Sequence, residues 1–127
     1  MPLTRYRPQM LAVLRIMTGL LFMVHGIQKV FGFPAPFALP MNPLLWTAAT
    51  LEIVGGIAIV AGFYTRYVAF VLAGMMAVAF FMAHFPRSFF PILNGGEAAV
   101  LYCFIFLYLF VAGGGMWSVD AARGKSA

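Results

Sequence analysis

Long apolar stretches separated by short polar connections dominate the chain. The stretches cover residues 9–30, 44–63, 67–85 and 92–113 of the 127-residue sequence. A helix needs about 20 mostly apolar residues to cross the hydrocarbon core of a bilayer, and each stretch approaches that length. The pattern therefore predicts an all-α fold, an integral membrane four-helix transmembrane bundle, with residues 1–127 forming a single domain.

The connections carry the residues that end helices. Prolines recur through 34–43, the second connection consists only of residues 64–66, and the third contains Pro86 and Pro91. Proline removes a backbone donor and clashes with the preceding helical turn, so it favours helix ends at these positions. The connections are short enough to predict that consecutive helices are neighbours.

Composition and charge place the chain in lipid. Hydrophobic residues make up 64% and charged residues 9%, against about 25% charged in soluble domains, and the mean hydropathy is +0.98. Of the basic residues, only Lys29 and Arg87 fall on one expected side, and the positive-inside rule predicts cytoplasmic termini. The other side carries Arg5, Arg7, Arg66, Arg123 and Lys125, with Arg15 nearby. This topology explains the net charge of +5 without a nucleic-acid partner, since no basic patch is interleaved with aromatics.

Ionisable residues inside the apolar stretches indicate where function resides. A charge at mid-bilayer depth costs roughly 3 kcal/mol, so such groups normally face the bundle interior and mark functional sites. In the first stretch, polar and aromatic residues follow steps of 3, 4, 3 and 4, which keeps them on one helical face. These residues are Arg15, Thr18, Phe22, His25 and Lys29. This face is expected to look inward.

The other three stretches each have one marked face. Glu52 shares its face with two small residues, Gly55 and Gly56, which let a neighbouring helix come close. His84 lies on a Phe-rich face, and Glu97 shares a face with Leu101, Phe104 and Tyr108. We expect these groups to converge in the outer half of the bundle, with Lys29 paired to Glu97 and Glu52 paired to either His25 or Arg15.

Cysteine and histidine usage argues against a resident metal. Cys103 stands alone within the fourth stretch, so no Cys-x-x-Cys pair or thiolate cluster is available. A haem held by His25 and His84 is disfavoured because both lie closer to the interface than membrane haem ligands usually do. We therefore expect neither a metal nor a haem.

Five short motifs occur in order along the chain. They are His25-Gly26 with Lys29, Glu52 with Gly55-Gly56, Gly62 with Thr65-Arg66, Asn94-Gly95-Gly96-Glu97, and residues 113–115 followed by Ser118 and Asp120. Together they resemble the DoxX family of small bacterial inner-membrane proteins, over most of the chain. The resemblance implies a four-helix inner-membrane protein described as an oxidoreductase component and related to subunits of quinone-linked thiosulfate or terminal oxidase systems.

The leading hypothesis is a redox-associated subunit that holds a quinone or another small lipophilic ligand in a polar intramembrane pocket, next to a soluble redox partner. The catalytic candidates, as proton donors or acceptors, are Glu52, His25, His84 and Glu97. The candidates for ligand contact are Lys29, Arg15, Asn94 and Tyr108. Each also has a structural interpretation, such as a buried ion pair, an interfacial hydrogen bond, a snorkelling cation or a first-turn acid.

Two other functions stay open at this point. One is a small transporter coupled to protons through Glu52, a class that often forms homo-oligomers. The other is a non-catalytic membrane scaffold that recruits a soluble redox enzyme. The absence of a Rossmann fingerprint, Cys cluster or P-loop in the sequence leaves the electron source to a partner or a bound substrate, so enzyme status is open as well.

Overall fold

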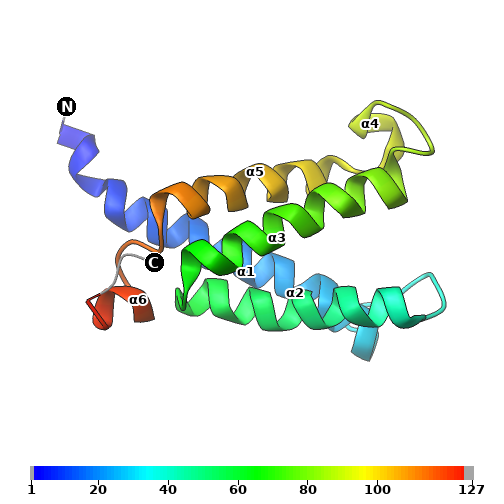
Figure 1. Cartoon of the computed structure of the whole chain (residues 1–127), viewed down its shortest axis with the longest axis horizontal. Coiled ribbons are helices and arrows are strands. Elements are labelled where there is room, and N and C mark those ends of the chain that lie inside the picture. The colour runs from blue at the N-terminus through cyan, green and yellow to red at the C-terminus, as the bar shows by residue number, and fades with distance from the viewer. Residues whose placement is uncertain (1, 125–127) are drawn as a thin grey trace.

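The computed structural model describes residues 2–124, and every regular element within that range is helical (Figure 1). Two long helices come first, and a third is extended by a turn of π-helix. The elements are η1 (Pro2–Tyr6), α1 (Arg7–Phe31), α2 (Pro43–Ala61), α3 (Thr65–Ala79), the π-helical turn η2 (Phe80–His84), α4 (Pro91–Asn94), α5 (Glu97–Ala112) and α6 (Val119–Ala122).

Helix length and surface chemistry fit a membrane environment. Within residues 2–124, three helical segments are long and apolar enough to cross a bilayer: η1 with α1, α2, and α3 with η2. The apolar helix α5 is shorter, at 16 residues. Large apolar side chains such as Ile57, Val71 and Val111 are more than half exposed, a pattern that suits contact with acyl chains. The prediction of an all-α membrane bundle is confirmed.

The fourth apolar stretch does not form one continuous helix from residue 92. Instead α4 ends at Asn94, Gly95 adopts a left-handed conformation with φ of 74°, and α5 begins at Glu97. The Asn94 side chain accepts a hydrogen bond from the backbone N–H of Gly96 at 2.7 Å. Because a side-chain oxygen satisfies this amide and the glycine reverses the chain, the helix is interrupted here.

Helices α1 and α2 pack closely against each other through glycines. A Cβ atom added to Gly26 on α1 would lie 2.7 Å from the carbonyl oxygen of Ala49 on α2. A Cβ atom added to Gly56 on α2 would lie 2.8 Å from the Cβ of Met23. Glycine at these points lets the two backbones approach without steric conflict, as is common between membrane helices.

Helices α3 and α5 form a second side-by-side pair, and Phe22 of α1 joins it to the first (Figure 1). The Phe22 ring meets the rings of Phe106 and Tyr102 on α5 edge-on, at centroid distances of 5.0 and 5.3 Å. Edge-to-face contacts of this kind are favourable beyond the area they bury. The core around them contains Ile59, Ala69, Leu72, Ala73, Met76, Ala99 and Leu109.

The two ends of the bundle differ. Figure 1 shows the start of α1, the turn between α2 and α3, and α6 at one end. Helix α4 and the connection between α1 and α2 lie at the other end. Four of the basic residues used for the expected orientation, Arg5, Arg7, Arg66 and Arg123, belong to the first end. Lys125, which was counted with them, lies outside the described residues.

Candidate functional site

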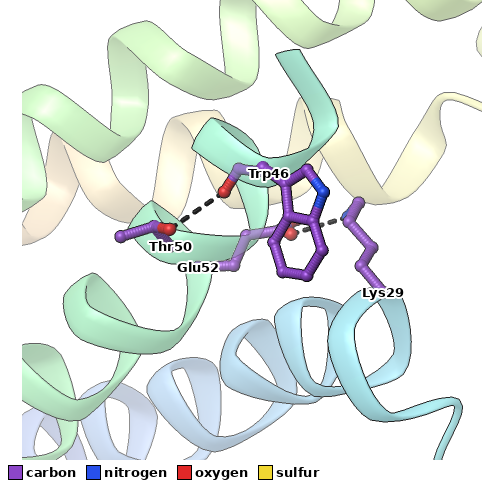
Figure 2. Close-up of polar contacts among 4 residues, drawn as sticks. All are labelled: Lys29, Trp46, Thr50 and Glu52. Atoms are coloured by element: carbon purple, nitrogen blue, oxygen red, sulfur yellow. Dashed lines mark hydrogen bonds and ion pairs between the residues drawn. The ribbon is translucent and has the colours of Figure 1, made fainter. Parts of the chain in front are cut away.

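A buried ion pair joins α1 to α2. The Nζ atom of Lys29 lies 2.6 Å from Oε1 of Glu52, and the two side chains are only 12% and 7% exposed (Figure 2). Both expected pairings are therefore wrong: Lys29 does not pair with Glu97, and Glu52 pairs with neither His25 nor Arg15. The reason is that α1 packs mainly on α2, which carries Glu52, whereas Glu97 belongs to the α3 and α5 pair.

Gly26, three positions before Lys29, allows this ion pair to form. A Cβ atom added to Gly26 would lie 3.0 Å from the Cβ of Glu52, so the absence of a side chain there admits Glu52 to the α1 surface. Lys29 is further covered by the proline-rich connection, where its ammonium lies 5.4 Å from the centre of the Phe37 ring. The Lys29 side chain thus points into the protein and does not extend toward the membrane–water interface.

His25 lies one helical turn before Lys29, on the same face of α1. Its ring meets the Tyr102 ring edge-on, with centroids 5.8 Å apart and an interplanar angle of 88°. His25 is exposed at the protein surface, while Tyr102 is half-buried. These four side chains, His25, Lys29, Glu52 and Tyr102, form what we call the polar cluster.

Tyr102 was missed by the sequence analysis, which selected Tyr108 instead. Tyr108 is 56% exposed and faces away from the core. The inward face of α5 follows steps of 3, 4 and 3 through Ala99, Tyr102, Phe106 and Leu109. This apolar spacing, and not the face that contains Glu97, is the sequence signal that places Tyr102 on the inward side of α5.

A groove of about 220 Å³ runs between α1 and α5 beside the polar cluster. Two of its lining residues carry hydroxyl groups: Thr18, which is buried, and Tyr102. The remaining lining residues are Leu21, Ala98, Leu101 and Ile105. His25 follows Leu21 by one helical turn, so a hydrogen-bonding side chain stands next to one end of this groove.

Arg15 has a structural position that the sequence did not reveal. Its guanidinium is fully buried and donates to the carbonyl oxygens of Ile59 at 3.0 Å and Trp117 at 2.8 Å. It also donates to Gly114 and, at 3.1 Å, to Met116. The carbonyls that Arg15 contacts in the segment after α5 have no helical partner, and Arg15 satisfies them. The Ile59 carbonyl at the end of α2 accepts from the Gly62 N–H at 3.1 Å as well as from Arg15. The Arg15 guanidinium thus uses its hydrogen bonds on backbone carbonyls at the end of the bundle that contains α6.

Asp120 completes this end of the structure. Its carboxylate accepts hydrogen bonds from the backbone N–H groups of Tyr64 at 2.8 Å and Thr65 at 2.9 Å, and from the Thr65 hydroxyl at 2.8 Å. A carboxylate at the start of a helix satisfies free amides and interacts well with the helix dipole. Asp120 therefore caps α3 from a distant part of the chain.

His84 and Asn94 form a separate polar network at the opposite end. His84 Nδ1 lies 3.1 Å from the carbonyl oxygen of Asn94, and since a carbonyl only accepts, Nδ1 carries the proton. The buried Asn94 side chain donates to the Ser88 carbonyl at 2.9 Å. Glu97 is exposed in the first turn of α5, where the helix dipole favours an acid. The structure thus brings His25, Lys29 and Glu52 together, and leaves His84, Asn94, Glu97, Arg15 and Tyr108 outside this cluster.

The polar cluster consists of titratable and hydrogen-bonding side chains on α1, α2 and α5. Among the described residues, no group of three or more His, Cys, Asp or Glu side chains is arranged to hold a metal ion. The cluster instead combines an ammonium, a carboxylate, an imidazole and a phenol at the side of an apolar groove. The fold and this site define a helical membrane protein with a polar interior.

Comparison with known proteins identifies the family. The model of the DoxX family matches residues 10–85. A Haemophilus influenzae protein described as uncharacterised is 41% identical over 125 residues, an alignment that covers 93% of each chain. The chain belongs to the DoxX family. No solved structure matches it.

Proposed function

We propose that this DoxX-family protein is an oxidoreductase-associated membrane subunit that binds the headgroup of a quinone or a similar lipophilic molecule in the groove between α1 and α5. The observation that carries the proposal is that two hydroxyl-bearing residues, Thr18 and Tyr102, are among the lining residues of an otherwise apolar groove, and that Tyr102 also contacts His25 of the polar cluster. Apolar sites with a few convergent polar groups are typical of small-molecule binding.

The size of the groove supports a ring-sized headgroup. Its volume of about 220 Å³ is below the roughly 300 Å³ at which sites for whole drug-sized ligands begin. A quinone ring would fill it while the isoprenoid tail extends among the acyl chains. The quinone carbonyls only accept hydrogen bonds, and the hydroxyls of Thr18 and Tyr102 and the imidazole of His25 can all donate.

The polar cluster would supply protons. Conversion of a quinone to a quinol takes up two electrons and two protons, and we assign the electrons to a redox partner protein. His25 is exposed, contacts the groove residue Tyr102, and lies one helical turn before Lys29 of the ion pair. We propose that His25 passes protons to the headgroup, that Tyr102 orients it, and that the ion pair sets the local charge.

The same proposal includes the location of the protein. The basic residues gathered at the end of the bundle that contains α6 favour a cytoplasmic position for that end. They include Arg5, Arg7, Arg66 and Arg123. The polar cluster and the groove would then open within the inner membrane, which is where quinones are dissolved.

The test is binding of decylubiquinone to the purified protein, measured by quenching of tryptophan fluorescence. Tyr102→Phe removes one hydroxyl and is expected to weaken binding by about fivefold to tenfold, the value of one hydrogen bond. Tyr108→Phe is the matched control, because it makes the same change on the exposed face of the same helix, and it should bind as the parent does. Equal affinity of all three proteins would contradict the proposal. Proton-driven dye uptake into vesicles without quinone binding would replace it with transport.

A further inference from the structure

A second groove lies between α1 and α2 and contains no polar side chain. It has a volume of about 190 Å³ and is lined by Leu20, Met23, Ile57, Val60 and Ala61. A site without hydrogen-bonding side chains is unsuited to a polar headgroup. Its lining matches the chemistry of a lipid acyl chain, which needs only apolar contact.

An arginine contacts the residues that follow the α2 end of this groove in the sequence. The groove reaches Ala61, the last residue of α2. Phe63 and Tyr64 follow Ala61 by two and three positions and lie in the turn to α3. The guanidinium of Arg123 lies over both rings, 5.7 Å from the centre of Phe63 and 5.3 Å from the centre of Tyr64. The rings hold one face of a planar cation, whose N–H groups point outward from its edges.

The surroundings of Arg123 favour an anionic ligand. Within residues 2–124 the salt bridge found is Lys29–Glu52, so no carboxylate neutralises Arg123 there. Arg123 is exposed, and Arg5 and Arg7 belong to the same end of the bundle. A guanidinium over aromatic rings at the end of an apolar groove is complementary to a phosphate joined to a hydrocarbon chain.

We propose that the α1–α2 groove and Arg123 together bind one anionic phospholipid, with an acyl chain in the groove and the phosphate on the guanidinium. This site is separate from the groove between α1 and α5, and the inference does not depend on quinone binding. The lipid would reinforce the contact between α2 and α6, because its chain packs on α2 while its phosphate contacts the residue that follows α6.

Native mass spectrometry of the protein released from mixed micelles of phosphatidylglycerol and phosphatidylcholine tests this inference. The parent protein should retain phosphatidylglycerol preferentially. Arg123→Gln should reduce that retention by about fivefold, the effect of one basic residue near an anionic lipid. The matched control Arg87→Gln, an exposed position between η2 and α4 at the opposite end of the bundle, should retain it. Ala61→Phe fills the groove and should also reduce retention, whereas Val78→Phe, at an exposed position of α3, should not.

The other outcomes would overturn the proposal. Unchanged retention in both Arg123→Gln and Ala61→Phe would show that the lipid is not held at this site. Displacement of the lipid by millimolar inorganic phosphate would indicate a phosphate site without a role for the groove. Conversion of a dimer to a monomer by Ala61→Phe, with lipid retention intact, would assign the groove to a second copy of the chain. Circular dichroism checks that each variant is folded. Decylubiquinone binding, measured separately, shows whether the quinone proposal fails independently of this one.

Discussion

Lys29 and Glu52, on adjacent helices, form an ion pair of 2.6 Å that is almost completely shielded by the protein. Such a pair contributes little net stability, because the attraction offsets the cost of removing two charges from water. Loss of one partner is different, since it leaves the other charge buried without compensation. This asymmetry makes the pair sensitive to single substitutions.

We predict that Glu52→Gln lowers the free energy of unfolding by about 3 kcal/mol, because it leaves the Lys29 ammonium unpaired. The double variant Lys29→Met with Glu52→Leu should recover most of that loss. Thermal unfolding followed by circular dichroism in nanodiscs measures both. The control is Glu97→Gln, the same change at an exposed position, which should cost no more than about 0.3 to 1 kcal/mol, the value of an acid in the first turn of a helix. A double variant as unstable as the single one would show that the pair stabilises the fold by more than charge compensation.

Gly26 and Gly74 provide a matched comparison of crowded and open helix positions. Gly26→Ala places a methyl group 2.7 Å from the Ala49 carbonyl oxygen, so it should separate α1 from α2 and cost about 1 to 3 kcal/mol. At Gly74 nothing lies within 4 Å of an added Cβ atom, and Gly74→Ala should stabilise α3 by about 0.5 to 1 kcal/mol. Chemical denaturation of the two variants checks the opposite signs. Destabilisation by Gly74→Ala would mean that another molecule covers this face.

The cap that Asp120 provides at the start of α3 can be tested at individual backbone amides. Asp120→Ala should cost about 2 kcal/mol, because it leaves the Tyr64 and Thr65 amides without their charged acceptor. Hydrogen exchange should accelerate at those two amides. Ser118→Ala removes the cap of α6, where the Ser118 hydroxyl accepts from the Ala121 N–H at 3.0 Å, and the bond of that hydroxyl to the Gly115 carbonyl at 2.8 Å. It removes no bond to the Tyr64 or Thr65 amide and should leave the α3 amides protected. Unaltered exchange in Asp120→Ala would show that other groups protect the start of α3.

Arg15→Lys tests whether the shape of the guanidinium matters in addition to its charge. A lysine ammonium cannot reach the several carbonyls that Arg15 contacts on α2 and on the segment after α5. We expect a loss of about 3 kcal/mol and a shift in Trp117 fluorescence, measured in a Trp46→Phe background. Arg5→Lys, at an exposed position, is the control and should change neither property. Parent-like behaviour of Arg15→Lys would mean that charge alone is sufficient.

The helices themselves could be predicted because they depend on local properties of the sequence. Apolar length defines the spans, and residues such as Asn42, whose side chain accepts from the Leu45 N–H at 2.9 Å, define helix starts. The interior position of Glu52 also followed from its glycine neighbours. The break before Glu97 was missed because it depends on the hydrogen bond from Gly96 to the Asn94 side chain, and apolar content does not reveal that bond.

The pairing of charges could not be predicted in the same way. A sequence gives the face on which Lys29 lies but not which neighbouring helix covers that face, so Glu52 and Glu97 were equally available. Arg15 illustrates a second limit. Its partners are backbone carbonyls of Ile59 and Trp117, and every residue has a carbonyl, so side-chain patterns carry no signal for such contacts.

The cap on α3 has a consequence for biosynthesis. Asp120 follows Thr65 by 55 positions, so α3 leaves the ribosome long before the carboxylate that satisfies its first amides. During translation, water or lipid headgroups must accept hydrogen bonds from those amides. This lasts until α5 has been made and the chain has returned to the same end of the bundle. Final assembly of this end is therefore a late event, and a nascent chain arrested before Asp120 should be recognised by membrane quality-control proteases as incomplete.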